Sequence, residues 1–197
     1  MDSLPAQAAA AAQSGVSLIQ IREAGLEGGA LFALVRRCVE AVRGTPARVI
    51  VNDRLDVALS AGAHGVHLRH DGVDPARVRA AVSRPFLIGR SIHSVQEARE
   101  ADASVLDYVI FGTVFETASK PGRPAAGLET LREVVAATRV PVLAIGGITS
   151  ATSGHIAATG AAGVAAIGTF VTTPEALRAS TQALSLGFDT ATRRSLP

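Results

Sequence analysis

Short apolar runs rich in Val and Ile recur along the chain, at the spacing of roughly 20 to 30 residues that βα units show. They have little strict alternation of apolar and polar positions, which is typical of parallel strands covered on both faces. Stretches between them carry apolar residues at helical spacing, as at 31–42 and 128–135. We therefore expect parallel strands that alternate with helices. The seven expected strands are 17–22, 47–52, 65–68, 86–89, 108–111, 141–145 and 163–167.

Two α/β architectures compete for this alternation. A doubly wound open sheet usually carries G-x-G-x-x-G after its first strand, and no strand here is followed by that motif. A (β/α)₈ TIM barrel has eight strands, but the alanine-rich start of the chain predicts a helix over about 4–13. We therefore expect a single barrel domain over 1–197 whose first strand is missing, through trimming or a misassigned start. Its two edge strands, 17–22 and 163–167, should lower stability or promote association.

Length and composition narrow the class of protein. The 197 residues suffice for one domain with a sizeable core. The single cysteine, Cys38, excludes an internal disulfide or a cysteine zinc site, and it is expected to be a buried apolar residue. The formal charge is +2 with acids and bases interleaved, so no nucleic-acid groove is expected. Without an apolar run of about 18 residues or a signal peptide, we expect no membrane segment and a cytoplasmic location.

Nearly every expected strand ends in a polar residue or a glycine. Barrel enzymes build their active sites from the loops at these carboxyl ends, so the concentration favours an enzyme or a ligand-binding barrel over a bare scaffold. The residues at these ends are Gln20, Arg22, Asn52, Asp53, His67, Ser91, His93, the stretch from Thr113 to Lys120, Gly146, Gly147, Ile167 and Gly168.

Two anion sites are expected among them. Gly146-Gly147 and Gly168 follow the last two strands, where a phosphate often meets backbone N–H groups in barrels; a simple turn is the alternative. The long loop after 108–111 offers the hydroxyls of Thr117 and Ser119 and the only lysine, Lys120. We expect this loop to close over a second anion such as a diphosphate. Arg22 is placed to clamp the same anion bidentately.

Three further patterns concern acid/base and metal chemistry. Asp53 offers a carboxylate for Mg²⁺, with capping of the next helix as the alternative. His93 is the candidate general acid/base because histidine titrates near neutrality, with helix-start capping as the alternative. His67 and His70 beside Asp71 look like a metal pair, but a strand residue and a loop residue do not converge as helical ligands do.

At this point the chain resembles the thiamine phosphate synthase and TenI superfamily, from Gly15 to about Leu177. The motifs are Gln20-Ile-Arg22-Glu, Val51-Asn-Asp-Arg54, Gly65-Val-His-Leu68, Ile88-Gly-Arg-Ser-Ile-His-Ser94, Asp107-Tyr-Val-Ile-Phe-Gly112, Val114-Phe-Glu-Thr117, Ser119-Lys120 and Ala144-Ile-Gly-Gly-Ile148. The resemblance implies a (β/α)₈ barrel that begins with a strand, a thiazole phosphate ligand and a homo-oligomer.

The superfamily has two enzymatic branches. Synthases use Mg²⁺ to join a hydroxymethylpyrimidine diphosphate to a thiazole phosphate and release diphosphate. TenI-type tautomerases aromatise a thiazole carboxylate phosphate without a metal. The chain has Ala24 where synthases usually carry a lysine, and Gly72 where they carry a second Mg²⁺ carboxylate. It also has Thr113 where TenI enzymes tend to have a catalytic histidine.

The residues of the motifs at 88–94 and 111–117 resemble those of TenI proteins more closely than those of synthases. We therefore predict a TenI-like thiazole tautomerase with His93 as its catalytic residue and no cofactor. The alternative is thiamine phosphate synthase, with Mg²⁺ at Asp53. A non-catalytic thiazole phosphate binder is the third interpretation.

Overall fold

The computed structural model describes residues 3–117, 122, 124–168 and 173–194. Within them seven strands form one parallel sheet in chain order. The strands are β1 (Leu18–Ile21), β2 (Arg48–Asn52), β3 (Gly65–Leu68), β4 (Leu87–Ile92), β5 (Tyr108–Gly112), β6 (Val142–Ile145) and β7 (Gly163–Ala165). The helices are α1 (Ser3–Gln13), α2 (Gly28–Ala41), α3 (Leu55–Ser60), α4 (Pro75–Ala81), α5 (Val95–Arg99), α6 (Gly127–Ala137), α7 (Ser150–Ala157) and α8 (Pro174–Arg194).

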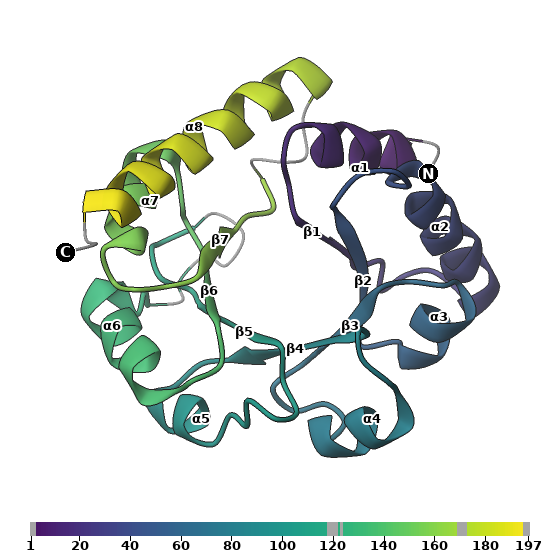
Figure 1. Cartoon of the computed structure of the whole chain (residues 1–197), viewed down its shortest axis with the longest axis horizontal. Helices are drawn as coiled ribbons and strands as arrows, with labels where there is room; N and C mark the ends of the chain where they lie inside the picture. Colours follow the sequence, from purple (N-terminus) through teal and green to yellow (C-terminus); the bar gives the residue numbers. More distant parts are fainter. Residues whose placement is uncertain (1–2, 118–121, 123, 169–172, 195–197) are drawn as a thin grey trace.

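The sheet curls around a central axis and the helices lie outside it (Figure 1). This arrangement confirms the expected α/β barrel with seven strands. In the described part of the chain no pairing joins β1 to β7, so each is an edge strand. Helix α1 comes before β1 and packs against α2 and α8. The association or loss of stability expected from the two edges stays a prediction.

Strands β4 and β7 differ most from their expected bounds, while the others agree to within one residue at each end. Strand β4 extends to Ile92, because its ladder with β5 continues through the pairing of Ser91 with Ile110. Ser91 therefore lies inside the strand, and His93 is the residue that follows it. Strand β7 is shorter than expected, since it pairs on one side only, with β6.

The core is divided between the two halves of the barrel. Residues of α1, α2, α3, β1 and β2 form one apolar cluster, in which Val35 and Cys38 of α2 pack with Val49 of β2. Burial raises the pKa of the Cys38 thiol to about 11, so this residue is an inert apolar filler, as expected. The second cluster joins β3 to β6 with the helices outside them, and Phe111 is its largest fully buried side chain.

A buried carboxylate ties the amino ends of β4 and β5 to α4. Asp107 directly precedes β5, and its Oδ2 accepts hydrogen bonds from Arg79 Nη2 at 2.5 Å and from the Ile88 backbone N–H at 2.7 Å. Its Oδ1 accepts one from Arg84 Nη1 at 2.6 Å. The Arg79 and Asp107 side chains are only 15% and 13% exposed. Removal of this carboxylate would therefore leave a largely buried guanidinium without its charge partner.

We expect Asp107→Ala to lower the free energy of unfolding by about 3–5 kcal/mol, the usual cost of breaking a buried pair on one side. Urea unfolding followed by circular dichroism measures this change. Asp102→Ala is the matched control, because the exposed Asp102 carboxylate bonds only the nearby Ser104 among the described residues. Equal losses in the two variants would contradict the role given to Asp107.

Candidate functional site

Three side chains from neighbouring strands meet inside the barrel. His67 of β3 is 3% exposed, and its Nδ1 lies 3.1 Å from the Tyr108 hydroxyl while its Nε2 lies 2.9 Å from Ser91 Oγ. The His67 and Tyr108 rings are stacked, with centroids 5.7 Å apart. Gly89 makes room for this stack, because a Cβ there would lie 2.0 Å from Tyr108 Cζ. The glycine thus sets where Tyr108, His67 and Ser91 lie.

Burial keeps this group of three neutral. It lowers the pKa of His67 to about 4, with a smaller contribution from the positive charge of Arg22. Burial also raises the pKa of Tyr108 far above its usual value. At neutral pH one His67 ring nitrogen donates and the other accepts, so the imidazole orients Ser91 rather than supplying charge.

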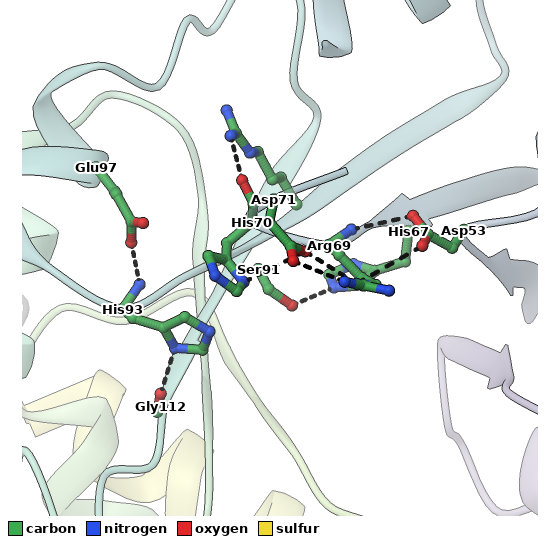
Figure 2. A network of polar contacts seen from close by, with 10 residues as sticks. Asp53, His67, Arg69, His70, Asp71, Ser91, His93, Glu97 and Gly112 are labelled. Atoms are coloured by element: carbon green, nitrogen blue, oxygen red, sulfur yellow. Dashed lines mark hydrogen bonds and ion pairs between the residues drawn. The ribbon is translucent and has the colours of Figure 1, made fainter. Parts of the chain in front are cut away.

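Two carboxylates at the carboxyl ends of β2 and β3 converge on one guanidinium (Figure 2). Arg69 follows β3, and its Nε and Nη2 donate to Asp71 Oδ1 and Oδ2 at 2.9 and 2.7 Å. The same Nε lies 3.8 Å from Asp53 Oδ2, and the Arg69 backbone N–H donates to Asp53 Oδ1 at 3.4 Å. The Asp53 backbone has φ 59° and its N–H donates to the His67 carbonyl at 2.8 Å.

His93 lies at the exposed edge of the same mouth, meaning the carboxyl ends of the strands. Its Nδ1 is 2.9 Å from the Gly112 carbonyl, which only accepts, so Nδ1 carries the proton. Its backbone N–H donates to Glu97, whose side chain forms a capping box with Ser94 at the start of α5. The His70 ring meets the His93 ring edge to face with centroids 4.9 Å apart. The residue that caps α5 is Ser94 and not His93, and the catalytic role of His93 stays a prediction.

The glycine pair after β6 packs against the loop after β5. A Cβ on Gly146 would lie 2.5 Å from Thr113 Cγ2, and one on Gly147 would lie 2.4 Å from the Glu116 carbonyl oxygen. Both glycines have positive φ, 106° and 63°. Close approach of the two loops is therefore a sufficient reason for Gly146-Gly147, and their binding of phosphate stays a prediction.

The remaining expected site residues spread over the mouth. Gln20 and Arg22 are exposed at β1, Asn52 is half-buried at the end of β2, and Thr117 is half-buried in the loop after β5. Ile167 is 58% exposed beside Gly168, after β7. Ser119 and Lys120 lie outside the described residues, so the closing of their loop over an anion stays a prediction.

Sequence reasoning missed the most closely connected residues of this mouth. Arg69 and Tyr108 were in no candidate set, and His67 entered only as a strand-end residue and, with His70, as a doubtful metal pair. The structure separates His67 from His70, because the His67 ring bonds Tyr108 and Ser91 inside the barrel while the His70 ring contacts His93. The Arg69-x-Asp71 spacing was the available signal for the ion pair, although it does not indicate that Asp53 joins it.

The residues around Asp53 do not fit a Mg²⁺ ion as they are arranged. Asp53 does not cap α3 either, since Arg54 is the residue before that helix. Mg²⁺ demands near-ideal octahedral oxygen ligands, whereas an arginine side chain lies against both carboxylates. Among the described residues no group of three or more His, Cys, Asp or Glu side chains is close enough to hold a metal ion.

The curled parallel sheet with cations, hydroxyls and glycines at the carboxyl ends of its strands defines an α/β barrel whose mouth is arranged as in barrel enzymes. Residues 1–170 match the family model described as thiamine monophosphate synthase. The thiamine-phosphate synthase of Methanoculleus marisnigri is 43% identical over 162 residues, covering 82% of this chain and 77% of the relative. That of Methanoregula boonei is 39% identical over 171 residues, covering 86% and 79%.

A solved structure agrees with these matches. Thiamine phosphate pyrophosphorylase from Pyrococcus furiosus superposes with a TM-score of 0.83 at 28% identity, covering 95% of this chain and 90% of that one. The chain belongs to the thiamine monophosphate synthase family. No described helix is long and apolar enough to cross a membrane.

These matches overturn the prediction of a TenI-like thiazole tautomerase, because the relatives and the structural neighbour carry the name of the synthase. The motifs that suggested TenI have structural reasons in a barrel of this kind. Gly89 accommodates Tyr108, Ser91 bonds His67, and Ser94 caps α5. A Cβ on Gly112 would lie 2.2 Å from the Ile145 carbonyl oxygen. Such residues report the packing of the barrel and do not distinguish its branches.

We expect the stability of the protein to fall between pH 6.5 and 4 through His67. The unfolded chain binds a proton at this residue below about pH 6.5, while the folded chain resists it until about pH 4, so acid favours unfolding. The difference corresponds to a loss of roughly 3 kcal/mol across that window, at 1.36 kcal/mol for each pKa unit.

Urea unfolding at several pH values, compared between wild type and His67→Gln, measures this contribution. The variant should lack that part of the pH dependence, whatever its stability at pH 7. His155→Gln, at an exposed position of α7, should keep the wild-type slope. A His67→Gln slope equal to that of the wild type would refute the assignment.

Proposed function

We propose that this protein is a transferase that joins a hydroxymethylpyrimidine diphosphate to a thiazole phosphate, which makes it a thiamine-phosphate synthase like its named relatives. The observation that carries the proposal is the family match over residues 1–170, which includes every strand of the barrel. An enzyme of this kind is what the named relatives indicate.

The reaction itself sets what the mouth must do. The bond between the pyrimidine methylene carbon and the diphosphate oxygen breaks, and its electron pair leaves with the diphosphate. The lone pair of the thiazole nitrogen forms the new carbon–nitrogen bond, which makes the ring a thiazolium cation. Catalysis therefore requires stabilisation of the negative charge on the leaving diphosphate and alignment of the two substrates.

The described residues supply groups for both needs. Arg22 at β1 and Arg69 at β3 bring permanent positive charge to the mouth, which suits a diphosphate. Ser91, held by neutral His67, offers a fixed hydroxyl for orienting a substrate. The loops at Gly146-Gly147 and Gly168 are our proposed place for the thiazole phosphate, through backbone N–H groups. The cytoplasmic location expected from the sequence stays a prediction.

We expect the purified protein to form thiamine phosphate and diphosphate in equal amounts from the two substrates. Chromatography of the thiamine phosphate and a coupled diphosphate assay measure the two products, with and without added Mg²⁺. The unaromatised thiazole carboxylate phosphate should keep its absorbance. Absence of thiamine phosphate under both metal conditions would reject the proposal.

Arg22→Ala should raise the KM for the pyrimidine diphosphate by roughly ten- to a hundredfold, the usual effect of losing a charge-assisted hydrogen bond. Arg43→Ala is the matched control, because Arg43 pairs with Glu40 just after α2, at the opposite end of the barrel. Steady-state kinetics on both variants make the comparison. A KM for Arg22→Ala equal to that of the control would remove Arg22 from the site.

A further inference from the structure

The Arg69 guanidinium supplies the positive charge beside the Asp53 and Asp71 carboxylates at the mouth. The Arg69 fork faces Asp71 with two hydrogen bonds, and the same side chain reaches Asp53 (Figure 2). The fork comes from the loop after β3, whereas Asp53 follows β2. The contact thus joins the ends of two neighbouring strands.

Gly72 lies in the turn after Arg69 and packs against Asp53. The Gly72 N–H donates to the Arg69 carbonyl at 3.2 Å in a tight turn. A Cβ at this position would lie 3.0 Å from Asp53 Oδ1 and 3.2 Å from the Arg69 carbonyl oxygen. A carboxylate side chain here would have to push Asp53 or the turn aside. The position that the family resemblance gives to a second metal-binding carboxylate is therefore occupied by the turn that holds Arg69.

The Arg69 guanidinium also has N–H donors left that can bind an incoming anion. The Arg69 side chain is 56% exposed, and its Nη1 has no hydrogen bond to the residues that the structure describes. A guanidinium has five N–H donors, so one arginine can hold carboxylates on one side and a phosphate on the other. The neighbouring Arg90 donates to the His70 carbonyl at 2.6 Å, which fixes the loop that carries these groups.

We propose that Arg69 is the resident cation of this site: its guanidinium takes the place of Mg²⁺ between Asp53 and Asp71, and the chain binds a diphosphate group without a divalent metal. The diphosphate half of this inference rests on the proposed function, whereas the metal half does not. A chelator cannot remove a charge that is part of the chain. The guanidinium also keeps a metal cation away from the same carboxylates, because it repels the cation and fills the space beside them.

Titration with Mn²⁺, followed by electron paramagnetic resonance of the free ion, tests the metal half without substrate. We expect the wild type to leave Mn²⁺ free and Arg69→Ala to bind one ion, with that binding lost in Arg69→Ala/Asp53→Asn. The matched control is Arg54→Ala, because Arg54 forms the same two bonds to Asp56, at 2.9 and 2.7 Å, on an exposed surface. The control should leave Mn²⁺ free.

Calorimetry with inorganic diphosphate tests the other half. The wild type should bind it with the same dissociation constant in chelator and in Mg²⁺. Arg69→Ala should bind it roughly ten- to a hundredfold more weakly in chelator and should regain affinity when Mg²⁺ is added. Circular dichroism and a thermal melt confirm that each variant is folded.

The outcomes separate this inference from the proposed function. Stoichiometric Mn²⁺ binding by the wild type that Asp53→Asn abolishes would overturn the inference, as would an Arg69→Ala variant that gains no Mn²⁺. Diphosphate binding by the wild type only in Mg²⁺ would overturn it too. If the Mn²⁺ results hold while no thiamine phosphate forms, the resident cation stands and the transferase proposal fails.

Discussion

The ring of Tyr108 occupies the space beside Gly89 inside the barrel, and the polar residues of the mouth depend on that contact. No other residue leaves room for the ring at position 89, since any Cβ there would overlap it. The stack then places His67, and His67 places Ser91. Because the imidazole is buried and neutral, these three side chains are held in place without any charge in the interior. The positive charge of the site is left to the arginines around the rim.

That division between a neutral interior and a charged rim suits a reaction with a diphosphate leaving group. A charged histidine inside the barrel would need a counter-charge, whereas exposed arginines keep their charge at little cost. The opposite end of the barrel is built differently. There the largely buried Asp107 carboxylate binds the largely buried Arg79, a backbone N–H and the more exposed Arg84, an arrangement that stabilises the end of the barrel opposite the mouth. Barrels commonly separate stability and chemistry between their two ends in this way.

The prediction of a tautomerase failed for a physical reason. The residues that suggested it, among them Gly89, Ser91 and Gly112, are required by strand packing or by hydrogen bonds within the barrel. Any member of a superfamily with this interior needs similar residues, so they carry little information on the reaction. Ala24 and Gly72 did depart from the synthase pattern. For Gly72 the structure gives a reason, because the turn of Arg69 and the Asp53 carboxylate surround it.

The sequence by itself determined the architecture. Buried parallel strands read as apolar runs, and the helix at 31–42 reads as a 3.6-residue period, because each element is patterned by the layer it packs against. Its strand ends also located the mouth, where Asp53, Ser91 and His93 lie. Only the tertiary structure decided which of those groups meet. The contact of Asp53 with Arg69 depends on the register of β2 against β3 and on the left-handed backbone at Asp53. Likewise, His67 finds its partner in Tyr108, 41 residues away, which lies beside it only in the folded barrel. Contacts between strands are fixed by pairing and curvature, which no local pattern encodes.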